Sequence, residues 1–422
     1  MPTGVYVSVP FCRTKCSYCN FASDVFSRAV FQRYIDRVCS DIELAAETAI
    51  RMGTHLDPAI DSVYLGGGTP TVLDATQLRR LFVTISQNFQ IRPDAEITVE
   101  CAPGTLSPAV IENLRGCGVN RVSLGVQSFV DLEAASVGRL HKRQTVEEDI
   151  THLRAAGIAN INVDLIAGLP HQTAESWDVS LAAAVASGVP HISVYMLEVD
   201  EDSRLGRELI AGGTKYHAHF APDEDLTADF YVAACERLEA VGVKQYEISN
   251  FAQEGRESRH NLKYWTRQPY LGLGADAHSM LFPAGAGNGE GHGFSHDPNV
   301  AQHVGFSPWG SSVDAVRFAM PDSLDAYLAG KEQEAFGVSP QSALEEFFFL
   351  GLRLTKGVSV QEAVARFGEQ ALAALSETIQ GLVEIGLLER QGGVIRLTLR
   401  GRLLSNEVFE RFIATAQPAL SS

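Results

Sequence analysis

The stretch that decides the fold lies near the start of the chain, where residues 5–19 read VYVSVPFCRTKCSYC. Its first part, Val5–Val9, is apolar and rich in β-branched residues, which is typical of a buried strand. Three cysteines follow, Cys12, Cys16 and Cys19, with the spacing Cys-x3-Cys-x2-Cys. Cubane [4Fe–4S] clusters normally take four thiolates, and no fourth cysteine follows nearby. We expect the triad to hold such a cluster and to leave one iron open for a ligand.

Zinc is the alternative metal for this loop, because sites of three cysteines and one histidine are common. No histidine lies within the loop, and the pair Cys16 and Cys19 has no partner pair downstream. The triad alone does not decide between the two metals. The rest of the chain favours iron–sulfur.

A regular alternation of strands and helices extends from the cysteine loop to about residue 198. Six βα units in a row predict an α/β fold, a partial (β/α)6-type parallel barrel wrapped by helices. In such barrels the chemistry lies in loops that follow strands, which is where the cysteine loop lies. The predicted strands are Val5–Val9, Ser62–Leu65, Glu96–Glu100, Arg121–Val126, Asn160–Ile166 and His191–Leu197.

The later part of the chain changes character twice. Residues 199–224 are polar and predict a surface excursion, followed by a helix over Thr227–Val241 and a strand over Gln245–Ser249. We expect the core domain to span residues 1–282 and a Gly-, His- and Pro-rich loop and linker to span 283–335. Residues 336–422 predict helices and then a hairpin, as in a winged-helix-like domain.

The composition of the chain indicates which kinds of partner and which compartment to expect. The net charge is −17, from 34 basic and 51 acidic residues, so we expect no nucleic-acid partner and interpret the C-terminal domain as a packing or partner module. No apolar run reaches 18 residues, which argues against an integral membrane protein. Seven cysteines and no signal-like start indicate a cytoplasmic protein without a disulfide framework.

A glycine-rich segment, Gly66–Pro70, follows the second predicted strand. Glycines there permit positive φ angles and close approach of a ligand to the backbone. The lysine and spacing of a P-loop are missing. The segment is either a plain tight turn or, level with the cysteine loop, a cofactor cradle, and we favour the cradle.

Polar residues recur at later strand ends. Glu100 ends the third strand, Gln127 ends the fourth, and Asp164 lies inside an apolar run. A buried carboxylate is costly unless it is paired or liganded, and Arg139 is a plausible countercharge. Each could belong to a structural ion pair, but several on one rim indicate a site.

These residues together resemble the radical S-adenosylmethionine (SAM) superfamily. The resemblance is carried by the cysteine loop, Gly66–Pro70, Val122–Phe129 and Asp164–Pro170. It implies that the open iron binds the amino and carboxylate groups of SAM, which one electron cleaves to methionine and a 5′-deoxyadenosyl radical. The implied cluster ligands are Cys12, Cys16 and Cys19. The implied SAM contacts are Tyr6, Tyr18, Gly67, Gly68, Thr69, Glu100, Gln127, Arg139 and Asp164.

Within that superfamily the chain resembles the branch of the oxygen-independent coproporphyrinogen III dehydrogenases. Those enzymes carry a further cysteine two positions after the third ligand, where this chain has Phe21. Residues 260–265, HNLKYW, and residues 270–279, YLGLGADAHS, resemble a haem-chaperone branch instead. That resemblance implies binding of haem and its transfer to haem-requiring membrane enzymes.

Two other functions stay open. One is the dehydrogenase itself, acting on coproporphyrinogen III with a reduced flavodoxin- or ferredoxin-type electron donor. The other is an iron–sulfur electron carrier, which is disfavoured because a carrier needs neither a glycine cradle nor an open iron.

The resemblance implies that His260 binds haem, since imidazole is the usual proximal ligand and Tyr264 and Trp265 offer flat apolar surface. The alternative is a satisfied core or surface histidine. His217 and His219 are rival ligands, although we expect both to be solvated loop residues. At His171 relatives usually have glycine, and this departure predicts an altered loop only.

Overall fold

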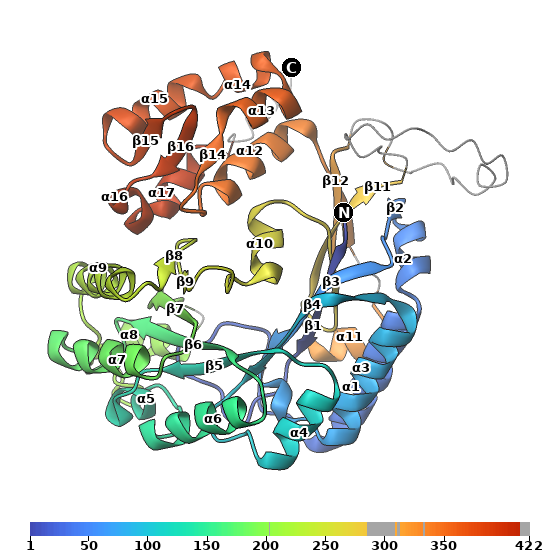
Figure 1. Ribbon diagram of the computed structural model, residues 1–422, viewed down its shortest axis with the longest axis vertical. Coiled ribbons are helices and arrows are strands. Elements are labelled where there is room, and N and C mark those ends of the chain that lie inside the picture. Colours follow the sequence, from blue (N-terminus) through green and yellow to red (C-terminus); the bar gives the residue numbers. More distant parts are fainter. Residues whose placement is uncertain (202, 285–308, 310–312, 332–333, 414–422) are drawn as a thin grey trace.

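The computed structural model describes residues 1–201, 203–284, 309, 313–331 and 334–413. Its largest element is a sheet of thirteen described strands, with helices outside it and a small domain at one end (Figure 1).

Six neighbouring strands of this sheet follow one another in chain order, each parallel to the next. They are β1 (Thr3–Val9), β3 (Ala59–Gly67), β4 (Gln90–Cys101), β5 (Arg121–Gln127), β6 (Asn160–Ala167) and β7 (His191–Met196). The predicted α/β fold with six parallel strands is therefore confirmed. A further strand that we did not predict, β10 (Tyr270–Leu273), lies parallel to β1 on its other side.

Antiparallel strands extend the sheet at both edges. Beyond β10 lie β11 (His278–Pro283), β12 (Ala315–Ala319) and β13 (Glu334–Val338), and β2 (Thr54–His55) pairs with β11. Beyond β7 lie β9 (Asn250–Ala252) and β8 (Lys244–Gln245).

The prediction of a single strand over Gln245–Ser249 is wrong. Residues 246–249 form the turn between β8 and β9, closed by the Tyr246 amide, which donates to the Asn250 carbonyl at 3.1 Å. The Glu247 carboxylate also accepts from the Ser249 amide at 2.9 Å. These local bonds replace a strand ladder.

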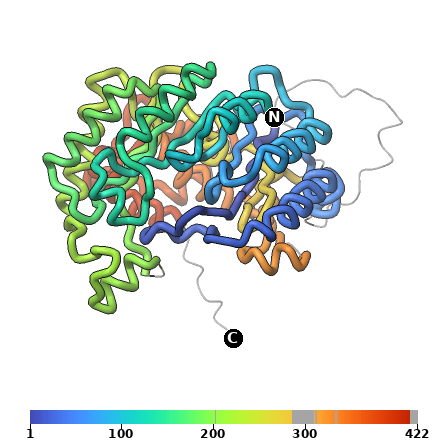
Figure 2. Tube along the Cα trace, turned by 90° about the horizontal axis from the view of Figure 1, so that it is seen from below, coloured from blue at the N-terminus to red at the C-terminus, as the bar shows by residue number. Residues whose placement is uncertain are grey.

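Helices cover the outside of the parallel strands (Figures 1 and 2). Asp74 begins α3 with a capping box, because its carboxylate accepts from the amides of Thr76 and Gln77. The covering helices are α1 (Arg28–Glu43), α2 (Ala45–Arg51), α3 (Ala75–Asn88), α4 (Pro108–Gly116), α5 (Asp131–Ser136), α6 (Arg143–Ala155), α7 (Ala174–Ala186) and α9 (Glu224–Ala240).

The expected polar excursion over residues 199–224 contains a helix, α8 (Arg204–Ala211), and a short 3-10 turn, η2 (Ala218–Phe220). Leu205 and Glu208 are buried, whereas Leu209 and Ile210 are exposed. The helix was missed because it has only eight residues and lies in an otherwise polar stretch.

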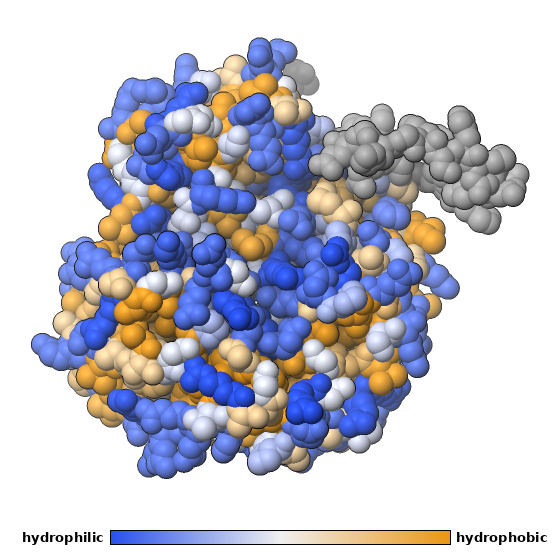
Figure 3. Space-filling model, in the orientation of Figure 1, coloured by the Kyte–Doolittle hydropathy of each residue, from blue (hydrophilic) through white to orange (hydrophobic). Residues whose placement is uncertain are grey.

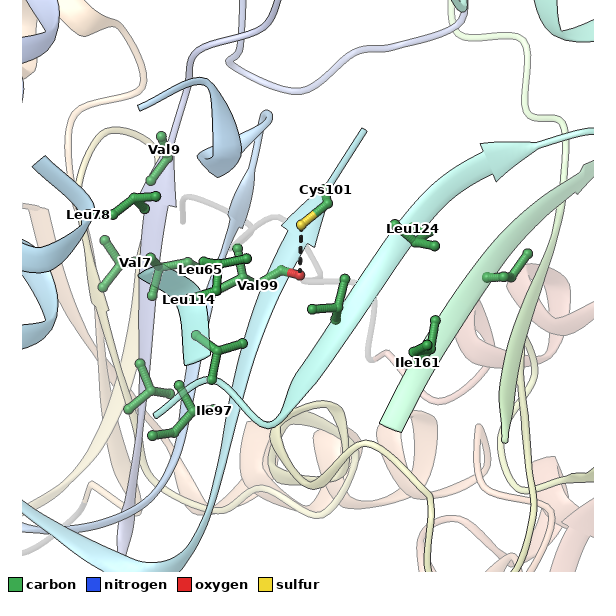
Figure 4. Close-up of a cluster of buried hydrophobic side chains, with 14 of the residues drawn as sticks. Val7, Val9, Leu65, Leu78, Ile97, Val99, Cys101, Leu114, Leu124 and Ile161 are labelled. Atoms are coloured by element: carbon green, nitrogen blue, oxygen red, sulfur yellow. Dashed lines mark hydrogen bonds between the residues drawn. The ribbon is translucent and has the colours of Figure 1, made fainter. Parts of the chain in front are cut away.

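The core lies between the parallel strands and their helices. Val7, Leu65, Val99 and Leu124 come from four neighbouring strands and are fully buried (Figure 4). Each such side chain contributes about 1.5–3 kcal/mol relative to exposure. The strands β4 to β7 alternate, because their apolar residues pack in this core while the polar residues between them line the inside of the barrel.

The C-terminal domain has its own core, in which the rings of Phe348 and Phe412 stack at 5.2 Å. A three-stranded sheet in the order β14-β16-β15 packs with helices, as predicted for a winged-helix-like fold. The elements are α12 (Pro340–Gly351), β14 (Val358–Ser359), α13 (Val360–Phe367), α14 (Glu369–Ala373), α15 (Ser376–Glu384), β15 (Leu388–Gln391), β16 (Val394–Leu397), α16 (Leu399–Leu403) and α17 (Ser405–Glu410).

The loop expected over residues 283–312 lies almost wholly outside the described residues. The rest of the expected linker contains β12 and α11 (Leu324–Leu328), and β12 pairs with β11 and β13 in the main sheet. The domain division at 282 and 335 stays a prediction.

Helix α10 (Arg259–Trp265) lies between the barrel and the C-terminal domain (Figure 1). The guanidinium of Arg353 lies 4.2 Å from the centroid of the Trp265 ring and 3.7 Å from the carboxylate of buried Glu247. Hydrophilic side chains are prominent where the two domains meet (Figure 3). Among the described residues, no helix is long and apolar enough to cross a bilayer.

Candidate functional site

The loop between β1 and α1 carries the three cysteines of the triad. It is pinned at both ends, because the Cys12 amide donates to the Asp24 carbonyl and the Asp24 amide donates to the Pro10 carbonyl, each at 3.0 Å. The Cys19 amide donates to the Cys16 carbonyl at 3.3 Å, which makes a tight turn. All three cysteines line one cavity of about 400 Å³.

The three thiols are free, and no group of three His, Cys, Asp or Glu side chains within the described ranges is already gathered as a metal site. A [4Fe–4S] cluster does not need such a gathering around one point, because each thiolate binds a different iron. Arg139 fits such a group, because its Nη1 lies 3.7 Å from the Cys16 sulfur and would stabilise a thiolate. The blue stretch that holds the loop crosses the face seen in Figure 2.

Cys101 also lines the cavity but differs from the triad. It lies at the end of β4, and its Sγ points back to the Val99 carbonyl at 3.7 Å (Figure 4). Burial raises the pKa of this thiol far above its ordinary value. Cys101 is therefore a neutral wall residue in this structure.

The glycine segment leaves β3 directly beside the cysteine loop. The Thr69 amide donates to the Phe11 carbonyl at 2.8 Å. At Gly68 a Cβ atom would lie 2.6 Å from the Val9 carbonyl oxygen and 2.8 Å from that of Phe11. Gly68 is thus required by the chain's own backbone, which the interpretation as a ligand cradle did not include.

Gly67 fits the cradle interpretation better. It has a φ of +91° and lines the cavity together with Gly68 and Thr69. A Cβ at Gly67 would lie 3.0 Å from the hydroxyls of Ser8 and Tyr6. The backbone here forms part of the cavity wall.

Glu100, at the end of β4, also lines the cavity. Its carboxylate accepts from the Tyr64 hydroxyl at 2.7 Å and from the Gly67 amide at 3.2 Å. Burial raises the pKa of Glu100 to about 7, with a further contribution from Asp164, while these two hydrogen bonds lower it. This carboxyl group therefore changes charge near neutral pH.

Asp164 lies on β6 on the same cavity wall. Its oxygens accept from the Ser123 hydroxyl at 3.1 Å and from the Asn162 amide at 2.7 Å. Burial raises the pKa of Asp164, and the hydrogen bonds oppose that rise. Asp164 and Glu100 thus form the acidic side of the cavity.

Gln127 and Arg139 line the cavity from β5 and from the loop after α5. Gln127 has a φ of +70° and follows an irregularity in the pairing of β5 with β6. Arg139 donates to the Gly125 carbonyl as well as to Cys16. The predicted countercharge therefore contacts a cysteine of the triad directly, rather than a carboxylate.

The two expected tyrosines differ in position. Tyr18 lines the cavity and packs against a buried cluster that contains Ile166 and Leu169. Tyr6 lies behind Gly67, with its ring centroid 6.1 Å from that of Tyr64. Burial raises the pKa of both phenols.

Apart from Glu100 and Asp164, sequence reasoning missed the polar residues below the cavity. They line a small cavity of about 50 Å³ inside the barrel. The signal was present, because Ser123 is opposite Asn162 and Asn162 is opposite His191 in register. The lining residues are Tyr64, Thr98, Glu100, Arg121, Ser123, Asn162, Asp164, His191, Ser193, Tyr195, Asn250, Ser258 and Asn261.

His260 lies near the amino ends of the strands, and only 1% of it is exposed. Its Nδ1 is 2.9 Å from the Ser62 hydroxyl, and its Nε2 is 2.8 Å from the Tyr264 hydroxyl. Burial lowers the pKa of His260 to about 3, with a smaller contribution from Lys263. Both ring nitrogens are engaged, so this geometry supports the satisfied core histidine and not the expected haem ligand.

The rival histidines lie elsewhere. His219 is exposed, as expected, but His217 is partly buried, with its ring centroid 5.0 Å from that of His171. Phe21 is 66% exposed and lines the mouth of the large cavity.

Comparison with known proteins agrees with this geometry. The sequence pattern of the radical SAM superfamily matches residues 6–184, and that of the HemN C-terminal domain matches residues 338–404. Coproporphyrinogen III oxidase (HemN) from Escherichia coli, whose structure is described as that of a radical SAM enzyme, superposes with a TM-score of 0.78. That match covers 98% of this chain and 90% of HemN at 21% identity, which establishes a shared fold. The cysteine loop on this fold defines a radical SAM protein.

Curated relatives refine the class. The heme chaperone HemW of Bacillus subtilis is 32% identical over 97% of this chain and 98% of its own length. HemW of Synechocystis is 34% identical over 85% of this chain and 80% of its own, and HemW of Mycobacterium tuberculosis is 32% identical over 96% and 94%. The chain belongs to the HemW family.

Proposed function

We propose that this chain is a haem chaperone that holds a [4Fe–4S] cluster and SAM, binds haem and delivers it to acceptor proteins. The observation that carries the proposal is a single cavity lined by three cysteines of one loop, a glycine segment and two buried carboxyl groups. The names of the curated relatives support the haem part.

The cysteine loop fits the cluster through its donor set. Cys12, Cys16 and Cys19 would supply three thiolates and leave one iron for SAM. The bound cluster would supply the electron that cleaves SAM. Arg139 keeps a positive charge beside Cys16, which lowers the cost of holding an anionic sulfur group in a partly buried loop.

The cavity beside the loop fits SAM in size and in chemistry. Its volume of about 400 Å³ is within the usual range for cofactor sites. The carboxyl groups of Glu100 and Asp164 would accept hydrogen bonds from amino and hydroxyl groups. The backbone at Gly67 and Thr69 allows close approach, and Gln127 and Tyr18 complete the wall.

Haem transfer needs partners outside this chain. We propose a membrane-associated, haem-requiring acceptor and a reduced flavodoxin- or ferredoxin-type donor, in the cytoplasm, where a reducing environment protects the cluster. Phe21 favours the chaperone, because the related dehydrogenases have a cysteine at this position at the mouth of the cavity.

Coproporphyrinogen III dehydrogenase is the second candidate function. One observation favours it, namely that all of the proposed SAM-binding residues except Tyr6 line one cavity. The dehydrogenase would use these residues to bind SAM for substrate chemistry, whereas the chaperone would use them to hold SAM alone.

Parallel assays on the anaerobically reconstituted chain separate the two functions. We expect one haem per chain by Soret titration and little or no protoporphyrinogen IX from coproporphyrinogen III with SAM and reduced flavodoxin. Robust turnover would overturn the chaperone proposal. Absence of haem binding would do so as well.

A further inference from the structure

A pair of histidines lies where the loop after β6 packs on the turn that holds η2, and the proposed SAM and cluster sites use neither residue. His171 follows β6, and His217 precedes η2. Their ring centroids are 5.0 Å apart, and the His171 ring stacks on Phe220 at 4.5 Å. The His171 amide donates to the Phe220 carbonyl at 2.9 Å, which joins the two segments.

The rings of this partly buried pair differ from those of His191 and His260, whose two nitrogens both have hydrogen-bond partners, and the His217 ring interacts electrostatically with the Glu208 carboxylate. His191 bonds to Asn162 and Tyr246, and His260 bonds to Ser62 and Tyr264. Within the described residues, no hydrogen bond is formed by the rings of His171 or His217. An imidazole with a free nitrogen can bind iron.

The backbone holds both histidines in an unusual conformation. His171 has a φ of +70° and His217 a φ of +60°. Positive φ is uncommon in residues other than glycine and costs about 1 kcal/mol or more, so it persists only where the surroundings impose it. Two imidazoles are thus presented in fixed positions on one turn.

The surroundings suit a flat apolar ligand with acidic groups. Phe220 is 59% exposed, and Leu209 and Ile210 of the neighbouring α8 are 48% and 69% exposed. Lys215, an exposed cation two residues before His217, is suited to a carboxylate. Aromatic and aliphatic surface beside a free imidazole and a cation matches the porphyrin ring, iron and propionates of haem.

We infer that the haem of the proposed chaperone binds at this turn, with its iron ligated by an imidazole of the pair His171 and His217. The inference rests on the proposed haem function and gives it a site. His260 has no part in iron ligation here.

The turn is connected to the cysteine loop by two routes. Leu169, two residues before His171, belongs to the buried cluster on which Tyr18 packs. The Glu208 carboxylate of α8 accepts from the amides of Tyr216 and Ala218 at 2.7 and 3.2 Å. At the other end of α8, the Leu205 amide donates to the Ser17 carbonyl at 2.8 Å.

Both routes end between Cys16 and Cys19. Haem at this turn would therefore affect the environment of the cluster through Ser17 and Tyr18. We expect haem to change the electron paramagnetic resonance spectrum of the reduced cluster in the full chain.

The test is a titration of the reconstituted chain with hemin, followed by the Soret band. The double variant His171→Gly with His217→Gly removes both imidazoles, and glycine accepts positive φ without strain, so the fold should persist. We expect its hemin affinity to fall by about tenfold or more, as for a lost metal contact. The binding of iron-free protoporphyrin IX should change little, because it needs no ligand.

Three variants and the wild type make the result decisive. His219→Ala, on the same turn, and His260→Ala should leave hemin affinity unchanged. Unchanged hemin affinity and spectrum in the double variant would overturn the inference, as would an equal loss of protoporphyrin IX binding. If the wild-type chain bound no hemin at all, the proposed function itself would fail.

Discussion

The two ends of the parallel strands use similar residues in opposite ways. At the carboxyl end, Glu100 and Asp164 are buried carboxyl groups that line a cavity of about 400 Å³. Toward the amino end, Glu96 accepts from the amides of Arg259 and His260 at the start of α10, and the cavity there is only about 50 Å³. Both ends bury polar groups, but only one leaves room for a ligand.

The difference shows what a motif can and cannot indicate. In the sequence, the cysteine loop and the HNLKYW segment are equally distinctive. In the structure, the first borders a cavity, whereas the second pairs its own polar groups: His260 with Ser62, and Lys263 with Asp61 at 2.8 Å. A distinctive segment can be required for assembly of a fold as much as for chemistry.

The largest expected effect concerns the iron content of the chain, and it tests whether the carboxyl end of the strands binds a cluster while the amino end does not. Cys16→Ala removes a thiolate, so about four iron per chain should fall to nearly none after reconstitution. His260→Ala and Cys101→Ala should keep the full iron content. The measurement is iron and sulfide analysis with the visible absorption spectrum. Retention of the cluster in Cys16→Ala together with its loss in Cys101→Ala would reassign the ligands.

A second large effect sharpens the role of the glycine segment. Gly67→Val adds a branched side chain at a φ of +91° beside the hydroxyls of Tyr6 and Ser8. SAM binding, measured by calorimetry, should be lost while iron content is kept. Gly157→Val is the matched control, because Gly157 has a φ of +86° with no neighbour within 4 Å. Equal SAM binding in both variants would remove Gly67 from the site.

A substitution at the amino end of the strands should change the free energy of unfolding rather than ligand binding. His260→Ala leaves a cavity and two unpaired hydroxyl groups, so the free energy of unfolding should fall by about 2–4 kcal/mol. In the folded chain the pKa of His260 is lowered to about 3 from its ordinary value of 6.5. Below pH 6.5 the unfolded chain therefore binds a proton at this residue that the folded chain does not, so the free energy of unfolding falls as the pH falls. The slope is about 1.4 kcal/mol per pH unit. Chemical denaturation at pH 7 and pH 5 should show a smaller pH dependence in the variant.

A smaller effect concerns the pH dependence of SAM affinity in the large cavity. Glu100, with a pKa of about 7, is protonated below neutral pH and ionised above it. An ionised carboxylate attracts the cationic groups of SAM, so affinity should rise from pH 6 to pH 8 by up to about tenfold. Glu100→Gln should flatten this dependence in the same calorimetric titration. A wild-type affinity that does not vary with pH would contradict the assignment.

The smallest effect concerns the contact of α10 with the C-terminal domain. Trp265→Leu removes the ring under the Arg353 guanidinium and should lower stability by about 1 kcal/mol. Thermal unfolding measures the change. Iron content and SAM affinity should stay at wild-type values, and a loss of either would connect this end to the cavity.

The sequence was sufficient for the parallel strands and for most of the cavity wall. The strands could be found from their β-branched, largely apolar composition, and their carboxyl ends meet at one edge, so the triad, Gly67, Glu100 and Asp164 could be placed together from order alone. The short strand β10 was not predicted because it has only four residues and one of them is Gly272. The glycine is needed there because a Cβ would lie 2.2 Å from the His278 carbonyl oxygen.

The rest depended on contacts between distant segments. His260 contacts Ser62, which lies almost 200 positions earlier in the chain. No local sequence pattern could predict that contact, so the sequence could not show whether His260 faces a ligand or Ser62. The pair of His171 and His217 likewise meets only because the turn after β6 packs on η2. Tyr6 was expected at the cavity but lies behind Gly67, with its ring beside those of Tyr64 and His260 inside the barrel.

The contacts of the cysteine loop have a consequence for synthesis of the chain. Its carbonyl at Ser17 accepts from the Leu205 amide, the Ser17 amide donates to the Val137 carbonyl at 3.2 Å, and Phe11 accepts from Thr69. Leu205 is made about 190 residues after Ser17, so the loop reaches its final shape long after it has been synthesised. Iron and sulfide should therefore be inserted late, into a nearly complete barrel, and a nascent chain stalled before Leu205 should hold its cluster poorly.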